Sequence, residues 1–297
     1  MIDPEIEKTT YLSIEKVNDP GKPNLSLFWR IAIVFMAVTG VWLLIGGLAD
    51  TLFGPEYSRP AHIFQAVLTS LVVIPMIVLA RRFLDRRSFA GLGLTRLRVG
   101  WRPLLIGMLC WFLPASMGIG VSVALGWTEI TPQAPPGDIV LLGIGLMLLV
   151  FIYEALPEEL IFRGYIYRNL ASNLPRWLAV FGQALLFMLW GFANGGANSV
   201  ERSLLFFMAA LILGIFRVVT GSLWASIGFH LAFQTIAQLF GTIGNQFFIS
   251  DPQVVSVFAF GIIPFATGIT LLNLFYKNRP HWLELEPEPA GNDQENA

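Results

Sequence analysis

Four ionisable side chains lie together in an otherwise apolar stretch of the sequence. The stretch reads FIYEALPEELIFRGYIYRNL, and the four are Glu154, Glu158, Glu159 and Arg163. Charged side chains are costly inside a bilayer, and those found there commonly mark function. This stretch is therefore a candidate catalytic site, although charges at the end of a membrane span can also lie simply in the headgroup layer.

The four side chains differ in the partners that the spacing predicts. Glu159 and Arg163 are four residues apart with the acid first, the order that favours an ion pair on a helix. Glu158 shares a helix face with Glu154 and has no such cation. It is the carboxylate that can take and return a proton as a general base. Pro157 removes a helical hydrogen bond, so we expect a kink here.

A second polar feature lies in the apolar segment GSLWASIGFHLAFQTIAQLFG. His230 is near its middle, and Gln234 follows one helical turn later on the same face. Both side chains can donate hydrogen bonds to one point, as the stabilisation of an oxyanion requires. The alternative is that they only bond across to a neighbouring helix.

The composition indicates that these residues are held by membrane helices. Of the 297 residues, 55% are hydrophobic and 13% are charged, and the mean hydropathy is +0.65. A soluble domain is about 25% charged. The net charge of -1 gives no case for a nucleic-acid partner. Cys110 is the single cysteine and cannot form a disulfide within the chain.

A spanning helix needs about 20 mainly apolar residues. The sequence therefore predicts an all-α, polytopic helical bundle with about eight spans. We place them near residues 31–49, 61–80, 104–126, 139–156, 177–193, 203–219, 222–243 and 254–276. Only Thr220, Gly221 and Ser222 separate the sixth span from the seventh, so that loop must be very tight or one helix must end early.

The positions of lysine and arginine predict the orientation. With the N-terminus in the cytoplasm, 17 of the 19 basic residues face that side, and only Arg59 and Arg202 fall outside. Both termini are therefore expected in the cytoplasm of a multi-pass plasma-membrane protein. Arg30 and His62 are expected at the interface, and Arg217 is expected to extend to the cytoplasmic surface.

Three segments follow from this pattern. Residues 1–26 form a polar N-terminal segment that does not resemble a signal peptide. Residues 27–276 form a single membrane domain. Residues 277–297 are acidic and polar, which predicts a disordered tail.

The motifs together resemble a known family. EELIFRG is similar to the glutamate-glutamate-x-x-x-arginine signature of the CAAX protease and bacteriocin-processing family of bacterial and other intramembrane endopeptidases. The GLGL segment from Gly91, a segment from Phe187 and a segment from His230 follow the family's order. The resemblance covers a protease-like core of about residues 80–245.

The resemblance implies a role for each matching residue. Glu158 would activate water, Glu159 and Arg163 would support it, and His230 would stabilise the oxyanion. The chain departs from the family pattern at two positions. Gly191 stands where the second motif has a histidine that helps to hold the water, and Gln234 stands where the third motif has an asparagine.

These observations leave three functional hypotheses open. The first is an endopeptidase that cleaves a peptide or membrane-protein substrate near the cytoplasmic leaflet, with no cofactor and no metal. The second is a catalytically weakened relative that binds peptides in immunity or regulation, which Gly191 motivates. The third is a transporter with a proton relay through Glu154, Glu158 and His230. The acids gather at one side only, which ranks the transporter last. The sequence does not indicate an oligomeric state.

Overall fold

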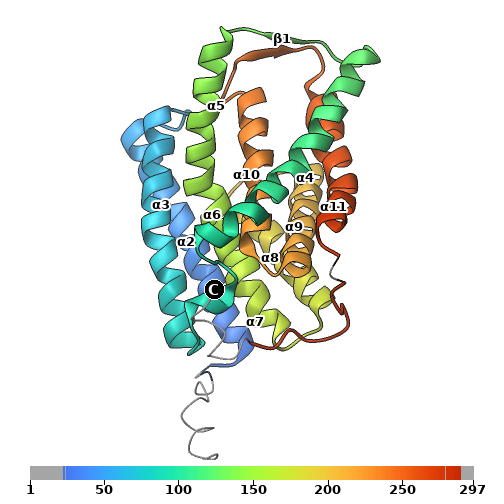
Figure 1. Cartoon of the computed structure of the whole chain (residues 1–297). Coiled ribbons are helices and arrows are strands. Elements are labelled where there is room, and N and C mark those ends of the chain that lie inside the picture. Colours follow the sequence, from blue (N-terminus) through green and yellow to red (C-terminus); the bar gives the residue numbers. More distant parts are fainter. Residues whose placement is uncertain (1–22, 24, 278, 289–297) are drawn as a thin grey trace, which may run out of the picture.

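The computed structural model describes residues 23, 25–277 and 279–288, and helices form nearly all of it (Figure 1). The prediction of an all-α helical bundle is confirmed. In chain order its elements are α2 (Leu27–Phe53), α3 (Arg59–Leu79), η1 (Ala80–Leu84), η2 (Phe89–Leu92), α4 (Leu97–Ala124), β1 (Ile130–Pro132), α5 (Pro136–Val150), η3 (Phe151–Ala155), α6 (Leu156–Glu159), η4 (Leu160–Ile166), α7 (Tyr167–Ala171), α8 (Arg176–Ala193), α9 (Val200–Thr220), α10 (Leu223–Phe240), β2 (Phe247–Ile249), η5 (Val254–Ile262) and α11 (Ile263–Phe275).

Seven helical stretches among the described residues are long and apolar enough to cross a membrane. They correspond to seven of the predicted spans. The eighth predicted span is α10, which is not among the seven and carries the polar side chains of His230, Gln234 and Gln238. With seven such helices, the chain is an integral, multi-pass membrane protein.

The fourth span is much longer than the sequence predicted. Instead of ending near residue 156, the helical stretch runs without a break from Pro136 to Ala171, which is 36 residues. At 1.5 Å per residue this is roughly 54 Å, well beyond the ~30 Å hydrocarbon core. The acidic motif therefore does not mark the end of the helix. Glu158 lies within the helix and is buried in the bundle.

Two features bring α10 close to the rest of the bundle. Its start is fixed by a tight turn, in which α9 ends at Gly221 with a left-handed φ of 68° and Ser222 caps α10. The tight loop is therefore the correct one of the two alternatives. Further along, an added Cβ at Gly228 would lie 2.0 Å from the carbonyl oxygen of Leu104 on α4. Such contact is possible only without a side chain, and small residues permit it in membrane helices.

A buried carboxylate ties three parts of the chain together at one end of the bundle. Asp85 accepts hydrogen bonds from Arg30 at 2.8 Å, Arg81 at 3.1 Å, Tyr165 at 3.1 Å and Asn169 at 2.9 Å. Arg30 is only 7% exposed. Asp85 and Asn169 provide Arg30 with partners within the protein, and its place at the membrane interface stays a prediction.

The first part of the acidic tail packs against this same end. The backbone N–H of Glu286 donates to Ala171 at 2.8 Å, and the carbonyl of Glu284 accepts from Arg176 at 3.1 Å. The Glu286 carboxylate accepts from the Tyr167 hydroxyl at 2.6 Å and from Arg168 at 2.5 Å. Residues 281–288 thus differ from the disorder expected for the tail, and residues 289–297 lie outside the described part.

Arg217 is part of the same contact. It is 3% exposed and lies 3.9 Å from Glu286. Its predicted extension to the surface is therefore wrong, because a carboxylate of the tail comes to it. Arg81 is likewise buried and pairs with Glu288 at 2.6 Å. The N-terminal segment lies almost wholly outside the described residues.

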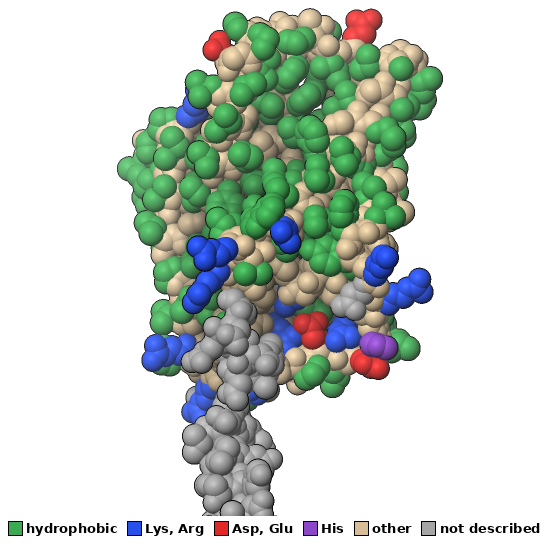
Figure 2. All heavy atoms as spheres, viewed as in Figure 1, with side chains coloured by type: hydrophobic (Ala, Val, Ile, Leu, Met, Phe, Trp, Pro, Cys, Tyr) green, Lys and Arg blue, Asp and Glu red, His purple; other side chains and the backbone are tan. Residues whose placement is uncertain are grey.

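The opposite end of the bundle carries a short two-stranded sheet. Strands β1 and β2 pair antiparallel, with Thr131 opposite Phe248, and they lie at the top of the view, far from the tail (Figure 1). Figure 2 shows that apolar side chains cover most of the visible surface, while lysine and arginine gather toward the lower end. This division is typical of a membrane-embedded body with a basic end.

Candidate active site

The backbone around the acidic motif departs from α-helical geometry on both sides of it. The short α6 lies between two π-helical turns, η3 before it and η4 after it. Pro157 has no N–H, and in a π register its donor would serve the carbonyl of Ile152, five residues earlier. The Ser70 hydroxyl donates to that carbonyl instead. The helix can therefore continue through Pro157 and carry its acids into the bundle.

Glu159 is the carboxylate that joins the motif to α10. It is fully buried, lies 3.0 Å from the Arg163 guanidinium, and contacts Nδ1 of His230 at 3.0 Å through the same oxygen. The predicted pairing of Glu159 with Arg163 is therefore present. Residues 71 positions apart in sequence meet here.

Arg163 is held by an aromatic ring as well as by a carboxylate. It is fully buried, and its guanidinium carbon lies 4.6 Å from the centre of the Phe187 ring on α8. A guanidinium over a ring face is attracted by the ring quadrupole. This contact positions Arg163 from the second-motif helix, so part of that motif contributes through Phe187 even though Gly191 has no side chain.

The contact with Glu159 also fixes the proton on the His230 ring. Glu159 is paired with a guanidinium and accepts hydrogen bonds, so Nδ1 must carry the proton in this contact. Nε2 of a neutral ring is then an acceptor, and it faces Glu158 at 3.8 Å. That separation exceeds a direct hydrogen bond. A water that donates to both groups would join them.

Gln234 does not take the position that the sequence predicted. Its amide nitrogen donates to Glu154 at 2.8 Å, and Gln238 donates to the other oxygen of Glu154 at 2.7 Å. The expected convergence of His230 and Gln234 on one free point is therefore not observed. Glu154, which seemed to lack a partner, receives two amides because α10 lies alongside the motif.

The place of the missing second-motif histidine is packed with aromatic rings. A Cβ added to Gly191 would lie 2.4 Å from the Phe206 ring of α9. Phe206 in turn stacks on Phe187 at 5.6 Å between ring centres. Trp190 is buried, and its Nε1 has no hydrogen-bond partner among the described residues. Gly191 thus allows Phe206 to approach α8.

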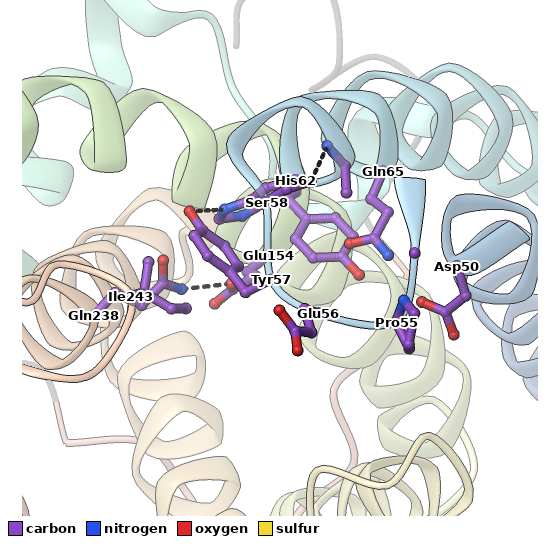
Figure 3. A pocket seen from close by; sticks show the side chains of 13 residues that line it. Asp50, Pro55, Glu56, Tyr57, Ser58, His62, Gln65, Glu154, Gln238 and Ile243 are labelled. Carbon is purple, nitrogen blue, oxygen red and sulfur yellow. Dashed lines mark hydrogen bonds between the residues drawn. The ribbon is translucent and has the colours of Figure 1, made fainter. Parts of the chain in front are cut away.

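A cavity of about 280 Å³ reaches the motif from the connection between α2 and α3 (Figure 3). Its lining includes Tyr153, Glu154 and Gln238, together with His62 and the surface loop of Pro55, Glu56, Tyr57 and Ser58. His62 is 5% exposed and contacts the Tyr57 hydroxyl at 3.3 Å. His62 is thus enclosed by protein, and its place at the membrane interface stays a prediction.

The sequence reasoning missed Gln238 and His62. Gln238 lies four residues after Gln234 and eight after His230, so a polar stripe on one helix face was available as a signal. His62 gave no comparable pattern. Within the described part of the chain, no group of three or more His, Cys, Asp and Glu side chains could hold a metal ion.

Comparison with known proteins gives one match. Residues 140–236 match the family model described as type II CAAX prenyl endopeptidase Rce1-like. This segment is about a third of the chain, and it runs from α5 through the acidic motif and Gly191 to His230 and Gln234. No curated protein and no solved structure matches the chain. The resemblance predicted from the motifs is confirmed over this segment.

Proposed function

We propose that this chain is an intramembrane endopeptidase, on the premise that residues 140–236 belong to the Rce1-like type II CAAX prenyl endopeptidases. The observation that carries the proposal is the arrangement of Glu158, His230 and Glu159. Two carboxylates of one helix approach the two nitrogens of one imidazole, at 3.8 Å and 3.0 Å. This is the geometry of an acid–base pair whose orientation a third group fixes.

In the proposed reaction, a water donates one hydrogen bond to Glu158 and the other to Nε2 of His230. Glu158 removes a proton as the water oxygen attacks the peptide carbonyl carbon. The same carboxyl group then returns that proton to the leaving nitrogen, so that an acid and an amine are released. Acid–base assistance of this type contributes about 10²–10⁴-fold to the rate.

This proposal gives His230 a different role from the one implied by the resemblance. An oxyanion donor must present a proton to the developing charge. Here the proton is on Nδ1 and is directed to Glu159, so Nε2 can only accept while the ring is neutral. His230 therefore serves as the partner of Glu158 in holding the water, the task for which Gly191 offers no side chain.

The supporting pair acts through His230 rather than on the substrate. Glu159 and Arg163 are both fully buried, and removing one member of a buried ion pair costs about 3–5 kcal/mol. We infer that Arg163 positions the Glu159 carboxylate as an acceptor, and that Glu159 keeps the imidazole in the productive tautomer. Both are positioning residues.

The second candidate function is a weakened relative that binds peptides without cleaving them. The observation in its favour is the ring of Phe206 at the position of the second-motif side chain, with Gly191 beneath it. The two candidates share a fold and a site. They differ in whether Glu158 is needed for the activity that is measured.

The test is cleavage of internally quenched peptides, with and without a prenylated cysteine, by the full chain in proteoliposomes. Glu158→Gln should lower kcat at least 100-fold, because an amide cannot take the proton. Glu201→Gln on α9 is the matched control, since Glu201 is exposed and distant in sequence from the motif. It should leave kcat unchanged.

Cleavage that survives Glu158→Gln would exclude the proposed mechanism. If neither peptide is cleaved by the parent chain but both bind, and binding survives Glu158→Gln, the peptide-binding candidate is favoured instead.

A further inference from the structure

The cavity beside Glu154 has a composition that sets it apart from the rest of this chain. Most of its lining is polar or charged, and this part includes Glu56, Tyr57, His62, Gln65, Glu154 and Gln238. The bundle around it is built from a chain that is 55% hydrophobic. Hydrolysis inside a bilayer requires water at the scissile bond. We propose that this cavity, called the vestibule below, is the route by which water reaches Glu158.

A polar cavity of this size holds water. A void lined by apolar groups stays dry, whereas polar groups that lack partners retain water. The vestibule has a volume of about 280 Å³, which is room for roughly nine waters at ~30 Å³ each. Oxygen Oε1 of Gln238 is buried and has no hydrogen-bond partner among the described residues. A water in the vestibule would satisfy it.

The vestibule extends from the surface to Glu154, the first carboxylate of the acidic stretch. Asp50 and the loop residues Pro55 and Glu56 are exposed at its mouth. Figure 3 shows these residues at one side of the space and Glu154, joined to Gln238, at another. His62 and Tyr57 also line the space, and their polar atoms contact each other at 3.3 Å. A path of hydrogen-bonding groups therefore lines the way in.

Glu154 forms the inner end of the vestibule. Glu154 lies one helical turn before Glu158 on the same stretch. Its second oxygen accepts from Gln234, which itself lies one turn beyond His230. The carboxylate that lines the vestibule is thus held by the helix that carries the partner of Glu158. Water that reaches Glu154 is within one turn of both groups that would activate it.

The vestibule also determines the side from which water enters. Its mouth is the connection between α2 and α3, whereas the tail contacts η1, α7, α8 and α9 at the other end of the bundle (Figure 1). Water therefore enters from the end opposite to the basic residues and the tail. The sequence led us to expect the opening on the basic, cytoplasmic side. The inference rests on the proposed function, because it supplies the water for that reaction.

The test uses one engineered cysteine in the full chain, with Cys110→Ala to remove the natural thiol. Gln65→Cys places the thiol on α3 in the vestibule, and Leu71→Cys on the same helix is the control, since Leu71 is 67% exposed on the apolar surface. A charged, membrane-impermeant methanethiosulfonate is added from each side of sealed, oriented vesicles. The rate of labelling and the peptide turnover are measured.

We expect the charged reagent to label Gln65→Cys at least 10-fold faster than Leu71→Cys, and only from the side of the α2–α3 connection. Labelled Gln65→Cys should lose at least 10-fold in turnover relative to its own unlabelled form, because the added group fills the vestibule. Leu71→Cys labelled with a permeant maleimide should keep its turnover.

Three results would overturn the inference: equally slow labelling of both cysteines, labelling of Gln65→Cys only from the side of the tail, or full turnover after labelling. The labelling rate does not depend on proteolysis. A dry vestibule in a chain that cleaves by means of Glu158 would refute the water route alone. A wet vestibule in a chain that does not cleave would refute the proposed function alone.

Discussion

The hydrogen-bonding role of His230 in the structure differs from the role that the sequence alone predicts. In sequence it pairs with Gln234, and two donors one turn apart indicate an oxyanion site. In the structure Nδ1 of His230 lies 3.0 Å from Glu159, to which it would donate, and the Gln234 amide donates to Glu154 at 2.8 Å. The imidazole is left with an acceptor toward Glu158. Periodicity identified the helix face correctly, but only the contacts across helices assign donor and acceptor.

Gly191 leads to a prediction at the residue scale. If it marks a lost catalytic position, Gly191→His should raise cleavage, but a Cβ there would lie 2.4 Å from the Phe206 ring. We therefore expect Gly191→His alone to destabilise the bundle and to give no gain. The double variant Gly191→His with Phe206→Ala should raise kcat/KM at least 10-fold over Phe206→Ala alone, as measured by peptide cleavage in proteoliposomes.

Phe206→Ala is the matched control, because it opens the same space without adding a base. Thermal unfolding of all three variants in detergent separates loss of folding from loss of activity. A double variant that folds as well as Phe206→Ala and cleaves no faster would show that position 191 does not face the reacting water.

At the scale of elements, the spans were predicted more accurately than their ends. The apolar run near 139–156 was found, but the helix continues to Ala171 through a proline and four charges. A prediction from hydropathy ends a span where charged residues begin, because it assumes that charged side chains face water. Here Arg163 and Glu159 form an ion pair inside the protein, and Ser70 supplies the donor that Pro157 lacks. The helix therefore continues past these residues to Ala171.

A prediction at the scale of elements concerns the contact between the tail and the helical bundle. Glu286 contacts the buried side chains of Arg168 and Tyr167 and lies near Arg217. Glu286→Ala removes the acceptor of Tyr167 and of one Arg168 nitrogen, while Arg168 keeps Glu288 at 3.5 Å, and losing one buried partner costs roughly 1–3 kcal/mol. We expect a lower unfolding temperature in detergent and faster cleavage of the tail by an added protease. Glu284→Ala is the control, since its side chain is 66% exposed, and it should change neither.

The same contact predicts a dependence on pH. Burial by itself raises the pKa of Glu286, but Arg217, the Tyr167 hydroxyl, Arg168 and Arg176 outweigh it and hold that pKa below its usual range. A carboxyl with a lowered folded-state pKa stabilises the fold above its unfolded value, and this contribution is lost as the pH falls through the folded value. The difference in unfolding temperature between the parent and Glu286→Ala should therefore shrink in acid, and a difference that grows in acid would contradict the assignment.

At the scale of the whole molecule, charge divides the bundle into two ends. Buried Arg30, Arg81 and Arg217 and the tail lie at one end, while the short sheet lies at the other. Because basic residues are retained in the cytoplasm, we predict that the end with the tail is cytoplasmic. The mouth of the vestibule then faces the opposite compartment.

Fusions test this orientation directly. A fluorescent protein after residue 297 should fluoresce in cells, and alkaline phosphatase at the same place should be inactive. Phosphatase inserted at Gly126, before β1, should be active, because that connection lies at the other end of the bundle. The reverse pattern would place the tail outside and would invert the predicted side of water entry.

The sequence by itself determined the membrane class, the approximate positions of seven spans, and the residues of the acidic motif and of α10. These depend on composition and on local periodicity, which are properties of short segments. Only the tertiary structure decided that Glu159 bonds to His230, that Gln234 and Gln238 hold Glu154, and that Phe206 fills the space at Gly191. These contacts join residues far apart in the chain, so they depend on how closely helices approach. Gly228 and its contact with Leu104 set one such distance, and no local pattern encodes it.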